Sequence, residues 1–187
     1  MPKSIMDNKI ALRFLNMSPV VLVTSMYDEQ TNIVTVNWTI PISFSPPYVA
    51  IVLGRGRYSH YLIESSRQFV INVPDTSMLD VVKFCGSITG RRRNKFMELE
   101  GKISRMPAIS MNVPIISECF AHIECMIHRT FEAGDHTIFL GSVQSVLAEK
   151  NVFTPDDVLD ISKQQPLIHL GGERFAALTP YGTKEIG

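Results

Sequence analysis

The chain has 187 residues, of which 45% are hydrophobic and 19% are charged, and its formal net charge at pH 7 is zero. This composition excludes an intrinsically disordered chain, and the length is sufficient to bury a substantial core. The balanced charge argues against a nucleic-acid partner, because nucleic-acid-binding proteins are usually basic.

Short β-branched runs separated by turns dominate the first part of the chain. The expected strands are VVLVTS (20–25), IVTVNW (33–38), YVAIVL (48–53) and QFVINV (68–73). The first two strands flank the turn YDEQTN (27–32) and should form a hairpin. The proline-rich segment PISFSPP (41–47) is expected to be a stiff connection without regular structure.

Helices are expected after Ser59 and over residues 75–85, the second capped by Asp75, Thr76 or Ser77. The segment GSITGRRRNKF (86–96) is expected to be a loop. The remaining expected strands cover 119–134, 136–149 and 166–170, with RFAAL (174–178) as a further candidate. Closely spaced strands with few intervening helices favour an antiparallel barrel over a doubly wound sheet. We expect one domain over residues 1–187, with a core at about 10–150 and a C-terminal extension at 151–187.

The sequence shows no targeting or membrane-spanning segment. No apolar run reaches the roughly 18 residues of a membrane-spanning helix, and MPKSIMDNKI lacks the apolar stretch of a signal peptide. We therefore expect a cytoplasmic protein without a membrane partner. The three cysteines form no Cys-x-x-Cys pair, so reduced thiols are expected rather than disulfides.

Two segments that contain glycine and arginine, GRGRYSH (54–60) and CGSITGRRRNKF (85–96), are the candidate binding elements. In GRGRYSH (54–60), a glycine allows close backbone approach, and the start of a helix offers unpaired N–H groups with partial positive charge. Arg57 and Ser59 could therefore hold a phosphate. In the alternative interpretation, Ser59 only caps the helix and the arginines face water. The third glycine of a dinucleotide fingerprint is absent, and no βαβ unit follows, so a Rossmann site is excluded.

Several motifs together resemble the flavin-reductase-like, FMN-binding split-barrel family, particularly its flavoredoxin-type branch. The matching stretches are PVVLVTS, TVNWTIPISFSPPYVAIVL, RYSHYLI, FVINVP, CGSITGRRRNKF, AHIEC and GDHTIFLGSV. They run from residue 19 to residue 143 in the family's order, and PLIHLGGERFAAL resembles the family's closing strands. The resemblance implies a mainly β, antiparallel split barrel with a few helices, forming a homodimer with FMN near the subunit interface.

The resemblance also implies which residues hold the cofactor. The turn along the flavin ring corresponds to Asn37, Trp38 and Thr39. The phosphate-binding segment corresponds to Arg57 and Ser59, with Tyr58 and His60 beside them. The loop that closes on the cofactor corresponds to Cys85, Gly86, Ser87, Thr89 and Gly90, with Lys95 as a further cation. Two positions depart from the family pattern: Asn94 replaces an aspartate, and Ser142 replaces a frequent glutamate.

The resemblance implies an oxidoreductase that takes a hydride from NAD(P)H and passes electrons to free flavin, ferric iron or a redox partner protein. The alternative is a flavoredoxin-type electron carrier without direct NAD(P)H turnover. His136 is the catalytic candidate, because the family keeps a histidine there that could orient nicotinamide. It could equally be a strand-end histidine bonded to Asp135, and Trp38 could simply fill the core.

A metal site is not expected, although cysteine and histidine recur every three residues at Cys119, His122, Cys125 and His128. On a strand, members on the same face would lie about 20 Å apart, too far for one ion. Cys85 is expected at the C-terminal end of a helix, where the helix dipole does not lower a thiol pKa. We expect it to pack or to contact the flavin.

Overall fold

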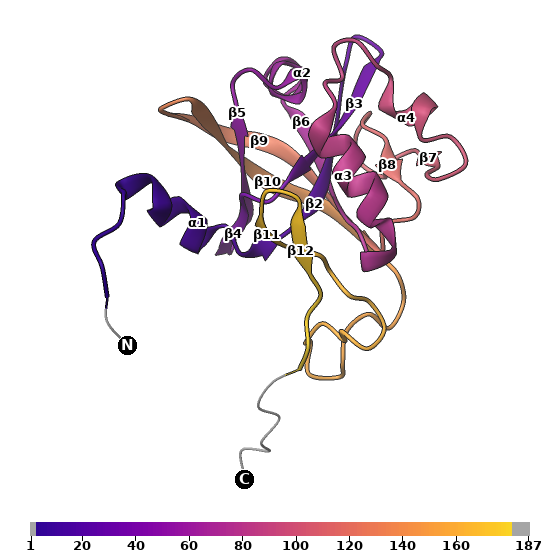
Figure 1. Ribbon diagram of the computed structural model, residues 1–187. Coiled ribbons are helices and arrows are strands. Elements are labelled where there is room, and N and C mark those ends of the chain that lie inside the picture. The colour runs from indigo at the N-terminus through magenta and orange to yellow at the C-terminus, as the bar shows by residue number, and fades with distance from the viewer. Residues whose placement is uncertain (1–2, 181–187) are drawn as a thin grey trace.

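The computed structural model describes residues 3–180, and its main element is a seven-stranded antiparallel sheet (Figure 1). The strand order is β3-β2-β6-β9-β10-β5-β4. The strands are β2 (Val21–Tyr27), β3 (Gln30–Val36), β4 (Thr39–Phe44), β5 (Pro47–Gly54), β6 (Gln68–Val73), β9 (Ala121–Ala133) and β10 (His136–Ala148). The expected mainly β, antiparallel architecture is confirmed.

Smaller elements surround this sheet. The helical elements are η1 (Asn8–Ile10), α1 (Ala11–Leu15), α2 (Tyr58–Ser66), η2 (Thr76–Met78), α3 (Leu79–Ser87) and α4 (Lys95–Glu98). The remaining strands are β1 (Ser18–Pro19), β7 (Arg105–Met106), β8 (Ile115–Ile116), β11 (Ile168–Gly171) and β12 (Arg174–Ala176). Strands β1, β11 and β12 form a second sheet, in which β11 pairs with both β1 and β12. Part of the expected extension at 151–187 lies outside the described residues, which end at 180.

The connection between β3 and β4 forces the sheet to curl. These strands are the two edges of the sheet, yet only Asn37 and Trp38 separate them in the chain. A connection this short spans no more than about 11 Å. The end of β3 and the start of β4 must therefore lie close together, and Val52 N of β5 donates to Trp38 O at 2.9 Å, which extends the β4–β5 pairing up to this connection. Asn37 and Trp38 are thus fixed at the seam of the barrel.

Strand β2 is buried on both faces, which explains its continuous apolar sequence. Val21 and Val23 point into the barrel core, where they belong to a cluster that includes Phe139. Val20 and Leu22 face the opposite way and join the core beneath α3. This alternation follows from the two-residue period of a strand. It places α3 directly over the outer face of β2 and β3.

Three local expectations are corrected. Residues 41–47 are not a connection: β4 covers Thr39–Phe44 as an edge strand, where the missing N–H of Pro41 is tolerated beside a register shift. Helix α2 begins at Tyr58, and its N-cap is Arg57 rather than Ser59. The expected loop at 86–96 is shorter than predicted, because α3 continues to Ser87 and α4 begins at Lys95, where the Asn94 side chain accepts a hydrogen bond from Met97 N. The predicted cap at Asp75 is confirmed, since its side chain accepts from Ser77 N.

Candidate cofactor-binding site

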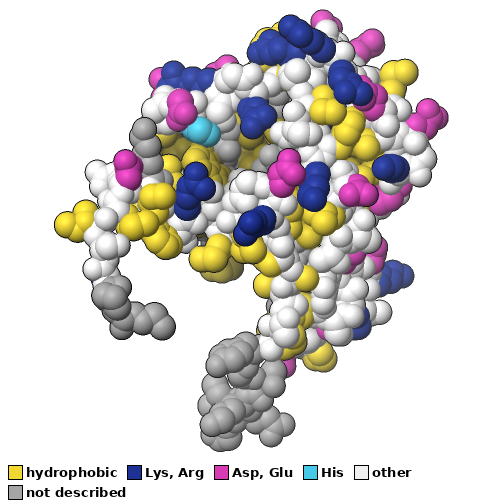
Figure 2. Space-filling view, in the orientation of Figure 1, with side chains coloured by type: hydrophobic (Ala, Val, Ile, Leu, Met, Phe, Trp, Pro, Cys, Tyr) yellow, Lys and Arg dark blue, Asp and Glu magenta, His cyan; other side chains and the backbone are white. Residues whose placement is uncertain are grey.

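Three neighbouring pockets meet at Arg57, at the end of the barrel where α2, α3 and the β11–β12 hairpin come together. The largest has a volume of about 420 Å³, and the other two have volumes of about 210 and 110 Å³. Arg57 lines all three. In Figure 2, hydrophobic side chains gather in the hollow between the N-terminal arm and the hairpin, with Lys and Arg at its border. We refer to the three as the large, middle and small pockets.

The small pocket lies at the start of α2 and contains the features that suit a phosphate. Its lining includes Tyr58 and Ser59 of α2 and Thr89 and Gly90 of the following loop. The first N–H groups of a helix have no partner within the helix, and the helix dipole places partial positive charge there. Together with the Arg57 guanidinium, these groups form a site that favours an anion.

Ser59 lies at the base of this pocket rather than in solvent. Its side chain is fully buried, and its Oγ accepts hydrogen bonds from Asn32 Nδ2 at 2.9 Å and Ser25 Oγ at 3.2 Å. The other end of the same amide, Asn32 Oδ1, is buried and has no hydrogen-bond partner among residues 3–180. A buried acceptor without a partner is costly, so this atom indicates a missing donor in the small pocket.

Lys95 is almost completely buried at the wall of the small pocket. Its ammonium donates to Ile33 O and to Cys85 O, both at 2.7 Å, so it joins β3 to the C-terminal end of α3. Burial lowers the pKa of Lys95 to about 8, with a further contribution from the nearby charge of Arg57. An anion in the pocket would oppose this shift by favouring the charged ammonium.

Cys85 lines the small pocket as a protonated thiol. Burial raises its pKa to about 12, despite the attraction of Lys95. A thiol with such a pKa is a poor nucleophile at neutral pH, so its contribution is packing and contact. Gly86 and Ser87, the next residues of α3, line the large pocket instead.

The middle pocket brings Trp38 and His136 together. Their ring centroids are 4.9 Å apart with an interplanar angle of 38°. Trp38 Nε1 donates to Asn16 Oδ1 at 2.8 Å, and His136 Nδ1 lies 2.7 Å from Asp135 Oδ1. A carboxylate only accepts, so Nδ1 is the protonated nitrogen of His136. Trp38 therefore lies in the pocket wall and not in the barrel core.

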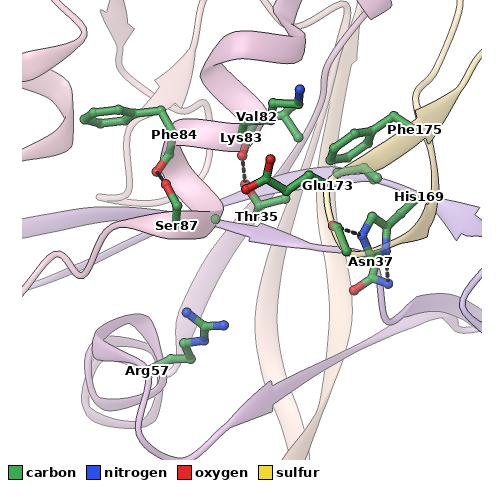
Figure 3. A pocket seen from close by; sticks show the side chains of 13 residues that line it. Thr35, Asn37, Arg57, Val82, Lys83, Phe84, Ser87, His169, Glu173 and Phe175 are labelled. Atoms are coloured by element: carbon green, nitrogen blue, oxygen red, sulfur yellow. Dashed lines mark hydrogen bonds between the residues drawn. The ribbon is translucent and has the colours of Figure 1, made fainter. Parts of the chain in front are cut away.

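The large pocket contains residues from the C-terminal hairpin that the sequence did not indicate. Figure 3 shows His169, Glu173 and Phe175 of the hairpin on one side of this pocket and Arg57 on the other. Asn37 lines both the large and middle pockets. Thr35 was missed as well: its Oγ1 donates to Val82 O at 2.6 Å, which fixes α3 against β3.

Two candidate residues do not line any of the three pockets. Thr39 Oγ1 donates to Ala50 O at 3.1 Å within the sheet. His60 is buried against Phe139, and its Nε2 lies 2.8 Å from Thr137 Oγ1. Burial lowers the pKa of His60, which outweighs the attraction of Glu64. His60 therefore supports the packing of α2 on the barrel.

The residues considered for a metal are dispersed. Cys119 Sγ contacts Met78 Sδ, His122 Nδ1 lies 2.9 Å from Asn72 Oδ1, and the His128 ring stacks on Tyr48. Within residues 3–180, no group of three or more His, Cys, Asp or Glu side chains is arranged to hold a metal ion. None of the helices in that range has the length and apolar character that crossing a bilayer would require.

The sequence of this chain matches a known protein family. The profile of the flavin reductase like domain matches residues 14–177. The chain belongs to the flavin reductase-like family. The resemblance deduced from the sequence is therefore confirmed, and the β11–β12 hairpin lies within the family domain.

Three relatives in this family illustrate the range of similarity. An uncharacterised protein of Archaeoglobus fulgidus is 36% identical over 63% of this chain and 66% of its own length. The uncharacterised Escherichia coli protein YddH is 33% identical over 88% of this chain and 89% of its own. An NADH-dependent FAD reductase of Streptomyces globisporus is 28% identical over 66% of each chain.

Solved structures share the fold over nearly the whole chain. The flavoredoxin of Desulfovibrio vulgaris has a TM-score of 0.84 at 23% identity, covering 100% of this chain and 98% of its own. The FMN-binding protein of Thermus thermophilus has a TM-score of 0.84 at 19% identity, covering 99% of both chains. The fold is that of the split barrels.

The pockets fit the chemical parts of a flavin mononucleotide. FMN combines a phosphate, a ribityl chain with hydroxyl donors and a flat ring. The small pocket offers cationic and N–H groups for the phosphate, and Asn32 Oδ1 offers an acceptor for a ribityl hydroxyl. The carboxylate of Glu173 in the large pocket would repel a phosphate, so a bound FMN would place its ring at that end.

Proposed function

We propose that the protein binds FMN and acts as an oxidoreductase, taking a hydride from NAD(P)H and passing electrons to an acceptor. The acceptor would be free flavin, ferric iron or a redox partner protein. The observation that carries this proposal is the position of Arg57, which lines the anion-suited small pocket and also the middle and large pockets. One ligand that combines a phosphate with a flat heterocycle accounts for this arrangement.

The chain's own residues contribute binding and orientation. Arg57 and the start of α2 would hold the phosphate, while Asn37 and Trp38 would form part of the wall around the ring. Bound FMN would supply the hydride and electron chemistry, which needs no protein acid or base.

His136 is the proposed catalytic residue. It lines the middle pocket beside Trp38, and Asp135 holds its Nδ1. In the neutral imidazole, Nε2 then carries no proton and can accept a hydrogen bond from the carboxamide of a nicotinamide. The S. globisporus relative, named as an NADH-dependent enzyme, supports NAD(P)H as the co-substrate.

A homodimer is part of the proposal. Edge strand β4 exposes Ile40, Ile42 and Phe44, and Phe44 is 98% exposed. The N-terminal arm beside it, which projects away from the barrel in Figure 1, exposes Phe14 and Leu15. Exposed apolar edge strands are usually covered by another chain. This apolar surface lies next to the middle pocket, because β4 begins directly after Trp38.

The first test identifies the ligand. The purified protein is denatured, and the released compound is identified by its mass. FMN is the expected result. Release of FAD would contradict the assignment of a single phosphate to the small pocket, and an apoprotein that fails to bind added FMN would contradict the proposal as a whole.

The second test separates the enzyme from the alternative, an electron carrier like the D. vulgaris flavoredoxin, whose fold this chain shares. NADH or NADPH is mixed with the FMN-loaded protein without oxygen, and the flavin absorbance is followed. Rapid bleaching supports direct NAD(P)H oxidation. A flavin that neither nucleotide bleaches, but that a reduced ferredoxin or rubredoxin bleaches, would establish the carrier instead.

A further inference from the structure

Asn37 is in hydrogen-bond contact with one residue near each end of the chain. Ser18 Oγ donates to Asn37 O, and the Asn37 Nδ2 atom lies 3.0 Å from His169 Nδ1. Ser18 and His169 are themselves register partners in the β1–β11 pair. A small second sheet therefore positions both the backbone and the side chain of the residue at the barrel seam.

The contacts of His169 determine which of its ring nitrogens carries the proton. His169 Nε2 lies 2.9 Å from Gly172 O, and a carbonyl oxygen can only accept. Nε2 must therefore be protonated. In the neutral imidazole, Nδ1 is then the acceptor.

This tautomer determines the orientation of the Asn37 amide. An accepting Nδ1 requires a donor, and Asn37 can supply one only through its NH₂ group. The amide oxygen of Asn37 is then turned away from His169. Figure 3 shows this oxygen on the side of Asn37 away from the hairpin, toward the space that Arg57 also borders.

We propose that His169 is a positioning residue that turns the Asn37 amide oxygen into the pocket, where it accepts a hydrogen bond from the N3–H of the flavin ring. The N3–H is the only ring N–H of an oxidised flavin, so it is the donor that an acceptor in this place would recognise. This inference rests on the proposed flavin-binding function. It makes His169 a specificity-determining residue although it need not touch the ligand.

The test compares the affinities of FMN and 3-methyl-FMN, in which a methyl group replaces the N3 hydrogen. The wild-type protein should bind 3-methyl-FMN at least about tenfold more weakly, because the amide oxygen loses its donor and meets a methyl group. In His169→Phe, the Asn37 amide loses its fixed partner and can rotate. The ratio of the dissociation constants of 3-methyl-FMN and FMN should therefore fall to about threefold or less. Asn37→Ala should reduce it similarly.

Leu170→Ala is the matched control. Leu170 is the next residue of β11, is 45% exposed and lines none of the three pockets. The control should keep the wild-type ratio. Equal binding of the two flavins by the wild type would overturn the inference while leaving FMN binding intact. Discrimination that survives Asn37→Ala would also overturn it, because another group would then exclude the methyl.

A second measurement tests the geometric basis without any flavin. The ¹⁵N chemical shifts of the His169 ring report which nitrogen is protonated. The Nε2–H tautomer is expected in the wild-type protein at neutral pH. A protonated Nδ1 would overturn the inference even if the protein binds FMN. If the expected tautomer is found but the protein does not bind FMN, the proposed function is overturned, and with it the role of His169 toward N3–H.

Discussion

The backbone of Gly90 lies directly against the side-chain amide of Asn32: a Cβ at Gly90 would overlap Asn32 Oδ1. Asn32 in turn donates to Ser59 at the base of the small pocket. The loop after α3 and the start of α2 are thus connected through one buried amide. This contact needs a glycine because of the limited space and not because of the backbone conformation, since Gly90 does not adopt a positive φ.

Gly90→Ala should therefore weaken FMN binding. The added methyl group displaces the Asn32 amide or the loop, which disturbs Ser59 and the wall of the small pocket. We expect a loss of about 1–3 kcal/mol in FMN binding free energy, the range for disrupting a buried hydrogen-bonded group. Titration calorimetry measures it. Gly56→Ala, where a Cβ meets nothing within 4 Å, should cause a smaller loss, and equal losses would contradict the Asn32 contact as the cause.

Arg57→Ala should weaken the binding of FMN more than that of riboflavin, which lacks the phosphate. A charge-assisted contact to phosphate typically contributes about 1.5–3 kcal/mol. Arg55→Ala is the matched control, because Arg55 lies two residues away and pairs with the exposed Glu132 at 3.1 Å. The comparison uses flavin fluorescence titrations. If Arg57→Ala affects both flavins equally, Arg57 does not bind the phosphate.

The preference for FMN over riboflavin should decline as the pH rises through about 8, where Lys95 loses its proton in the ligand-free protein. A bound phosphate favours the charged ammonium, so binding above this pH requires proton uptake. Near pH 7 the lysine is largely charged and the phosphate is close to a dianion, so the preference should be greatest there. Above about pH 8, FMN affinity relative to riboflavin should fall by up to about tenfold per pH unit. In Lys95→Met this dependence should disappear, and its persistence would exclude Lys95 as the source.

His136→Ala should slow flavin reduction by NAD(P)H more than it weakens FMN binding, because His136 is proposed to orient the nicotinamide. Stopped-flow absorbance gives the reduction rate, and a separate titration gives the FMN affinity. Asp135→Asn, which removes the carboxylate that fixes His136 Nδ1, should produce a smaller decrease. An unchanged reduction rate in His136→Ala would leave this histidine a structural role.

Phe44→Glu should convert a dimer to monomers if edge strand β4 forms the subunit contact. The substitution places a charge on a side chain that is 98% exposed in one copy, so the fold of that copy should tolerate it. Sedimentation velocity measures the oligomeric state, and circular dichroism monitors folding. A folded variant that remains dimeric would place the contact elsewhere.

Local patterns in the sequence predicted most of the sheet. Strand β6 falls at the predicted residues, and β9 and β10 differ from the prediction by one or two residues at their ends. Their apolar periodicity is strong, and the turn at Gly134 and Asp135 separates them clearly. Strand β4 was missed because Pro41 argues against a strand, and only the position of β4 at the sheet edge makes this proline compatible with one.

The candidate site was predictable only where contacts are local in sequence. The cluster at Arg57, Tyr58 and Ser59 follows from a helix start after a glycine turn. The role of Asn32 could not be deduced, because its partners Ser59 and Gly90 are distant in the chain and its signal is a buried unpaired atom. His169 likewise carries no local signal, since its relation to Asn37 exists only after β11 has paired with β1.

The bond between Asn37 and His169 joins residues 132 positions apart. During translation all strands of the seven-stranded sheet, the last of which ends at Ala148, leave the ribosome before His169 does. A nascent chain can therefore form most of its sheet while the wall beside Asn37 is still incomplete. Capture of the flavin is expected to be a late event, after synthesis of residue 169 and its strand, and not a nucleus around which the barrel folds.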